Sequence, residues 1–148
     1  MIKIFTSIFF VVSLYASLDA AAQTSPVGLW KSIDDHTGKA MALIRISDSN
    51  GEIKGKIEKL FTAATEDPNP KCIKCDDARK DQPVIGMTII EGMHADGAGY
   101  TGGTILDPDN GKVYKSHMTL VEHGSKLKVR GYVGLPMFGR TQVWMREP

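Results

Sequence analysis

Tight-turn signals between short apolar runs constrain the fold of this chain more than any other feature of its sequence. Residues 105–114 place Asp107-Pro108-Asp109-Asn110-Gly111 between two strand-like runs. The last pair of that cluster can adopt the positive φ angles that a tight hairpin requires. The same pattern recurs at Asn50-Gly51 and in residues 122–125. A chain with turns of this kind is predicted to form an antiparallel β meander.

Alternation of apolar and polar residues between these turns predicts eight strands. In residues 52–61, Ile53, Gly55 and Ile57 alternate with charged residues, which is typical of a strand with one buried and one wetted face. We expect strands at residues 27–33, 40–47, 52–61, 85–91, 100–106, 112–121, 126–133 and 140–146. Hairpin-joined strands in this number favour an all-β, eight-stranded antiparallel up-and-down barrel, because closure removes exposed sheet edges.

One connection, residues 62–83, is much longer than the others and contains three prolines, both cysteines and no periodicity. Loops of this length are usually functional, braced or mobile. Cys72 and Cys75 are expected to form a disulfide that stiffens this loop. A redox-active pair or a metal site are the alternatives, but zinc needs about two further ligands. The histidines that could supply them stand singly at His36, His94, His117 and His123.

The N-terminal residues have the pattern of a secretory signal peptide. A basic start at Lys3 precedes the apolar residues 4–18, and Ala20-Ala21-Ala22 provides a small-residue cleavage site. We therefore expect residues 1–22 to be a signal peptide, residues 23–148 to form a single barrel domain, and the protein to be exported to the periplasm or secreted. Cleavage removes one basic and one acidic residue, so the formal net charge stays +1.

Several classes of function have little support in the sequence. No block of like charges is long enough for nucleic-acid binding, and no second apolar segment is long enough to span a bilayer. The G-x-S-x-G and H-E-x-x-H motifs of hydrolases are absent. We expect no enzymatic activity, no catalytic residue, no metal and no cofactor.

Six short motifs occur in order along the chain. They are Gly28-Leu29-Trp30, residues 51–57 (GEIKGKI), residues 72–75 (CIKC), residues 102–114, residues 129–132 (VRGY) and residues 139–144 (GRTQVW). Together they resemble an exported bacterial family known as domain of unknown function 2147, over nearly all of the chain after residue 22. The resemblance implies a lipocalin-like (calycin-type) barrel and brings no established activity with it.

Gly28-x-Trp30 on the first strand, with arginines on the last, looks like the lipocalin arrangement in which a tryptophan packs beneath an arginine at the closed end. A guanidinium over an indole contributes roughly 0.5–2 kcal/mol while its donors bind carbonyl groups of the opening strand. Arg140 and Arg146 are both candidates for this contact. The alternative is a tryptophan that only fills the core and arginines that lie in solvent.

An eight-stranded barrel is either just filled by side chains or able to hold one small ligand. Apolar residues that could line a cavity are Met41, Leu43, Met87, Ile89, Tyr114, Met118, Leu120, Tyr132 and Met137. Methionines adapt well to flexible apolar ligands. The first hypothesis is therefore a non-enzymatic protein that binds a small hydrophobic or amphiphilic molecule in the cell envelope.

Two other hypotheses remain. The second is a packed barrel that acts as an interaction or envelope-support module through loops 62–83 and 134–139, with an envelope protein as partner. The third is a thiol-redox factor that uses Cys72 and Cys75.

Overall fold

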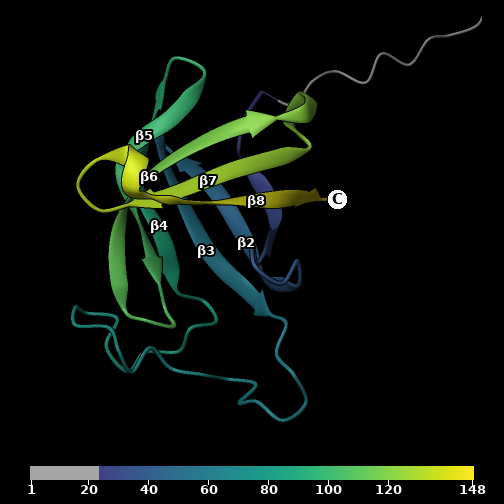
Figure 1. The fold of residues 1–148 in the computed structure, drawn as a ribbon, viewed down its shortest axis with the longest axis vertical. Helices are drawn as coiled ribbons and strands as arrows, with labels where there is room; N and C mark the ends of the chain where they lie inside the picture. Colours follow the sequence, from purple (N-terminus) through teal and green to yellow (C-terminus); the bar gives the residue numbers. More distant parts are fainter. Residues whose placement is uncertain (1–23) are drawn as a thin grey trace, which may run out of the picture.

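The computed structural model describes residues 24–148, so the predicted signal peptide lies outside the described residues. The chain forms eight strands and two short 3₁₀ segments (Figure 1). The strands are β1 (Gly28–Ile33), β2 (Ala40–Ser49), β3 (Glu52–Leu60), β4 (Thr88–Asp96), β5 (Gly99–Asp107), β6 (Lys112–Val121), β7 (Lys126–Tyr132) and β8 (Arg140–Glu147). The 3₁₀ segments are η1 (Glu122–Gly124) and η2 (Pro136–Phe138).

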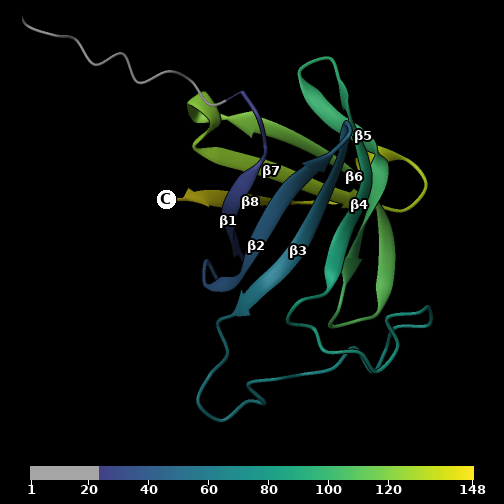
Figure 2. The same cartoon turned by 180° about the vertical axis from the view of Figure 1, so that it is seen from behind.

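Each strand pairs antiparallel with the next one along the chain, and the last strand returns to the first to close a barrel. Closure takes place where Leu29, Trp30 and Lys31 of β1 pair with Glu147, Arg146 and Met145 of β8. Strands β6 to β8 face the viewer in Figure 1 and β1 to β3 face the viewer in Figure 2. The prediction of an all-β, eight-stranded up-and-down barrel is confirmed.

The largest error in the predicted strand bounds concerns β4. The prediction placed this strand at residues 85–91, whereas it begins at Thr88 and continues to Asp96. Residues 84–87 form a turn closed by the bond from the Met87 amide to the Val84 carbonyl. The last three residues of β4, His94, Ala95 and Asp96, pair with β5 and are all exposed, so no apolar alternation marks them in the sequence.

The barrel interior is filled by side chains from every strand. Alternation places Trp30, Ile44 and Leu127 inward, and their neighbours Lys31, Arg45 and Lys128 outward. The large side chains below 2 % exposure are Trp30, Trp144, Ile44, Ile46, Ile90, Met93, Leu106, Met118 and Leu127. These residues form one continuous apolar core.

The connection between β3 and β4 is braced at several points. Cys72 and Cys75 form the predicted disulfide, and the Cys72 amide donates to the Gln82 carbonyl at 2.9 Å. Lys71 and Pro83 form an isolated β-bridge. Both cysteines belong to the buried core, at 0 % and 2 % exposure. The loop is thus tied to itself and to the barrel, below which it lies in Figure 1.

The β5–β6 turn packs against this loop. Gly111 adopts φ +72°, and its amide donates to the Asp107 carbonyl at 2.8 Å. Its partner Asn110 keeps a negative φ, so only one residue of this pair uses the left-handed region, whereas Asn50 and Gly51 both do at the β2–β3 turn. A Cβ atom on Gly111 would lie 1.9 Å from the Lys74 carbonyl oxygen. Glycine is therefore required here for close approach as well as for conformation.

Replacing Gly111 with alanine should destabilise the protein far more than the same change at Gly38. Both glycines have φ near +70°, but nothing lies within 4 Å of a Cβ on Gly38. Both variants bear the cost of a left-handed alanine, about 1–2 kcal/mol. The backbone clash with Lys74 adds at least about 2 kcal/mol for Gly111→Ala. Urea unfolding measures both values, and equal losses would show that the loop does not pack on this turn.

Candidate functional site

One end of the barrel is sealed by Trp30 and Arg146. The Trp30 side chain is completely buried, and its indole nitrogen donates to the Pro26 carbonyl at 2.7 Å. The guanidinium carbon of Arg146 lies 4.3 Å from the centre of the Trp30 ring system. Burial lowers the pKa of Arg146 from its usual value. The cation therefore closes this end of the core as a flat lid over the indole.

The same guanidinium connects three segments of the chain. It donates from Nη2 to the Ser25 carbonyl at 2.7 Å, from Nη1 to the Val27 carbonyl at 2.9 Å, and from Nε to the Gly124 carbonyl at 2.7 Å. A Cβ atom on Gly28 would lie 2.9 Å from Nη1. Of the two arginines considered from the sequence, Arg146 therefore lies on Trp30, and Gly28 provides the space for it.

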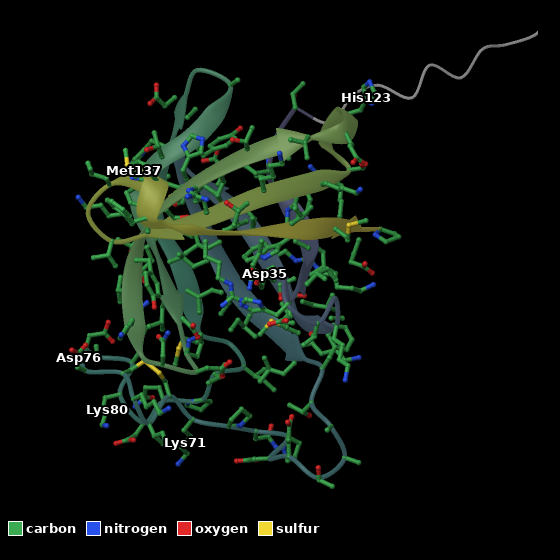
Figure 3. The ribbon with its side chains drawn as sticks, viewed as in Figure 1. Asp35, Lys71, Asp76, Lys80, His123 and Met137 are labelled. Atoms are coloured by element: carbon green, nitrogen blue, oxygen red, sulfur yellow. A yellow bond between two sulfur atoms is a disulfide. The ribbon has the colours of Figure 1, made fainter. Side chains whose placement is uncertain are left out.

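Arg140 lies at the opposite end, where it links β8 to the β1–β2 turn. Its Nε donates to both carboxylate oxygens of Asp35 at 2.7 Å. Its Nη2 lies 3.6 Å from Oδ2 of Asp34. The hydrogen bond from Arg140 lowers the pKa of Asp35 to about 2. This ion pair ties β8 to the β1–β2 turn at the end of the barrel opposite Trp30 and Arg146. Figure 3 labels Asp35 there.

The interior toward that end combines incompletely buried apolar residues with one buried hydroxyl group. Leu60 pairs with the inward-facing Ala42, and Ile105 pairs with Tyr114, which shares the inner face of β6 with Ser116. Leu60, Ile105 and Tyr114 are only partly buried. A site lined in this way can bind apolar groups and orient one polar atom.

Ser116 is the buried side-chain polar group without a hydrogen-bond partner within residues 24–148. Its register partners on the neighbouring strands are Gly103 and Gly131, so neither neighbour places a side chain beside it. An unpartnered buried hydroxyl costs about 1–3 kcal/mol. The sequence analysis did not select Ser116. Its signal was a serine at the inward-facing position between Tyr114 and Met118.

The structure does not bring together the nine residues predicted to line a cavity. Met118 is fully buried in the interior, Tyr114 and Leu120 lie on the same inner face, and Met87 and Ile89 are buried in the core. The remaining four lie elsewhere. Met41, Leu43 and Tyr132 alternate with inward-facing residues and so lie on the outer face, and Met137 is 70 % exposed in η2.

Two surface hollows stand out outside the core. One of about 400 Å³ lies between the β4–β5 hairpin and η1, with Tyr100, Leu120 and His123 in its lining. The other, of about 360 Å³, lies at the base of the long loop, with Arg79, Met87 and Glu91 in its lining. Both are open to solvent and neither reaches Ser116.

Other kinds of site have little geometric support. In the part of the chain that the structure describes, no three His, Cys, Asp or Glu side chains are grouped so that they could hold a metal ion. Among the same residues, no helix has the length and apolar character needed to cross a bilayer. Cys72 and Cys75 are buried, and Figure 3 draws their disulfide as a yellow bond in the part of the long loop where Lys71, Asp76 and Lys80 are labelled.

Comparison with known proteins identifies the family. The chain belongs to the family described as "Uncharacterized protein conserved in bacteria (DUF2147)", whose model matches residues 28–146. No curated protein matches the chain. A solved structure from Helicobacter pylori, described as belonging to the lipocalin family, is similar with a TM-score of 0.69 at 15% identity, over 85% of each chain. The expected family and the lipocalin-like fold are confirmed.

Arg146→Lys should lower the free energy of unfolding by about 2–3 kcal/mol, because an ammonium group cannot reach three carbonyls and cover the indole together. Arg140→Lys, at the other end of the same strand, should cost less than about 1 kcal/mol, since its partners are exposed carboxylates. Chemical denaturation of both variants measures the difference. Equal costs would contradict the role assigned to Arg146.

The Asp35–Arg140 pair should make stability depend on acid pH. Because the pKa of Asp35 is lower in the folded protein, the pair stabilises above pH 3.8 and its contribution is lost as the pH falls toward 2. Asp35→Asn should cost up to about 1 kcal/mol at pH 7 and much less at pH 2, where about half of the Asp35 carboxyl is protonated in the folded protein. Asp96→Asn, an exposed carboxylate without an ion pair among residues 24–148, is the control. If Asp35→Asn lowers the free energy of unfolding at pH 2 by as much as at pH 7, this assignment is contradicted.

Proposed function

We propose that this member of the DUF2147 family is an exported, non-enzymatic barrel that binds a small hydrophobic or amphiphilic molecule at the end opposite Trp30, in the cell envelope. The observation that carries the proposal is the unpartnered Ser116 hydroxyl, which lies on the same inner face as the partly buried Tyr114. The lipocalin-like fold supports it at the level of architecture.

The packing limits where such a ligand can bind. Side chains such as Met118 and Trp144 fill the middle and the sealed end. A ligand would therefore enter between Leu60, Ile105 and Tyr114, move these side chains apart, and place one polar group on Ser116. Burial of its apolar part would contribute roughly 25 cal/mol per Å². The hydrogen bond would remove the penalty that the free hydroxyl bears in the empty barrel.

Export is supported by the sequence of residues 1–22 and by the chemistry of the long loop. A disulfide such as Cys72–Cys75 forms and persists in oxidising compartments. The envelope is such a compartment in bacteria. Both observations support export, and fractionation of bacterial cells that produce the protein would test it.

The second candidate function is a packed barrel that acts through its outer surface as an interaction or envelope-support module. It is favoured by the filled interior and by the exposed apolar residues between β7 and β8, among them Met137 and Phe138. The redox hypothesis has less support, because thiol–disulfide exchange needs an accessible sulfur and both cysteines are buried.

Ser116→Ala should separate binding from folding. Removal of an unsatisfied buried hydroxyl should leave the stability of the empty barrel unchanged or raised. It should weaken binding of a polar-headed apolar probe, 8-anilinonaphthalene-1-sulfonate, by about tenfold if the hydroxyl binds the ligand. Fluorescence titration and thermal unfolding measure the two effects.

Met41→Ala, on the outer face of β2, is the control and should leave the probe affinity unchanged. Native mass spectrometry of protein purified from its own host should also show a bound molecule. A clean ligand-free mass together with no probe uptake would overturn the proposed function.

A further inference from the structure

The outer face of β6 and β7 carries basic side chains that lack acidic partners. Their neighbours Met118 and Val129 point inward, so the alternate residues point outward. The outward-facing basic residues in the middle of these strands are Lys115, His117, Lys128 and Arg130. Within residues 24–148, the ion pair on this face joins Lys126 to Glu122 at its far end, and none involves the lysines at 115 and 128. We call residues 115, 117, 128 and 130 the basic face.

The loop between β7 and β8, residues 133–139, exposes large apolar side chains. Their exposed fractions are 67 % for Val133, 56 % for Leu135, 70 % for Met137 and 74 % for Phe138. Figure 3 shows Met137 at the edge of the barrel. We call this loop the apolar tip. Exposed apolar side chains concentrated in this way mark a surface that contacts another phase or molecule.

The apolar tip is fastened to the basic face. Arg130, which points outward from β7, donates from Nε to the Pro136 carbonyl at 2.7 Å and from Nη1 to Thr141 Oγ1 at 2.7 Å. A Cβ atom on Gly139 would lie 2.8 Å from the Tyr132 Cβ, and Tyr132 pairs with Lys115. The apolar and the basic groups therefore lie side by side on one surface, which faces the viewer in Figure 1.

We propose that this surface docks on a bilayer that contains anionic phospholipid. The apolar tip inserts at the boundary between headgroups and acyl chains, and Lys115 and Lys128 lie against the lipid phosphates. Apolar side chains flanked by basic ones are the combination that binds such surfaces. Tyr132, between the two, has the amphipathic character of residues found at membrane interfaces. This inference deepens the second candidate function and does not depend on ligand binding inside the barrel.

Charge favours a lipid surface over a second copy of the chain. A symmetric dimer through this face would bring Lys115 and Lys128 of one copy against those of the other. Like charges placed opposite one another at an interface oppose association. An anionic bilayer instead offers a continuous surface of opposite charge to the basic face and an apolar layer to the tip.

Vesicle co-sedimentation tests the proposal. A chain that begins at Gln23 retains every strand and omits the apolar residues 4–18. It should bind vesicles of phosphatidylcholine mixed with phosphatidylglycerol, less at high salt, and should not bind pure phosphatidylcholine. Met137→Ser with Phe138→Ser, and separately Lys115→Gln with Lys128→Gln, should each lower the partition coefficient about tenfold.

Matched changes elsewhere are the controls. Lys54→Gln with Lys56→Gln alters β3, which lies four strands from β7 and so on the opposite side of the closed barrel (Figure 2). Ile73→Ser removes an apolar side chain that is 64 % exposed in the long loop. Both controls, and Ser116→Ala, should keep wild-type vesicle binding.

Three results would overturn the proposal. The first is absence of binding to anionic vesicles. The second is a loss of vesicle binding in Lys54→Gln with Lys56→Gln that equals the loss in Lys115→Gln with Lys128→Gln. The third is a dimer, detected by sedimentation velocity, that only Met137→Ser with Phe138→Ser dissociates. Retention of vesicle binding by Ser116→Ala together with loss of probe uptake would show that docking and ligand binding are separate properties.

Discussion

The contact between the first and last strands is the constraint on which the rest of the barrel depends. The pairing of β1 with β8 is short, and without it both strands would be open edges exposed to pairing with other chains. Arg146 strengthens this junction, because one guanidinium binds the segment before β1, covers Trp30 and reaches Gly124 after β6. The same side chain therefore supports the closed junction of the sheet and seals the core beside it.

Closure determines where chemistry can take place. With the interior filled by residues such as Met118 and Trp144, the ligand of the proposed function would have to enter at the end opposite Trp30, near Ser116. The disulfide-braced loop that contains Cys72 and Cys75 packs on the β5–β6 turn at the same end of the barrel. The outer surface of β6 and β7 remains accessible for contacts of a different kind, which involve Lys115, Lys128 and the apolar tip. The proposed binding inside and the proposed docking outside would thus use different residues.

Much of the architecture could be predicted from local pattern. Turn residues such as Asn50-Gly51, together with two-residue alternation, indicated all eight strands, and the two cysteines of a chain with an export signal indicated the disulfide. The bounds of β4 were wrong because its last residues are exposed on both faces and have no alternation. The sequence could not divide the nine candidate lining residues between the inner and outer faces of the barrel. An apolar residue such as Met41 has no local sequence signal that separates these two faces.

The sequence by itself determined the number and order of strands and the antiparallel meander, because turn chemistry and alternation depend only on near neighbours along the chain. The family was indicated separately, by the resemblance of six ordered motifs. Tertiary structure alone decided that Arg146 and not Arg140 covers Trp30, that Ser116 lacks a partner, and that Gly111 approaches Lys74. Each of these depends on register and packing between segments distant in sequence. Their distances are set by closure of the whole barrel, which no local stretch of sequence encodes.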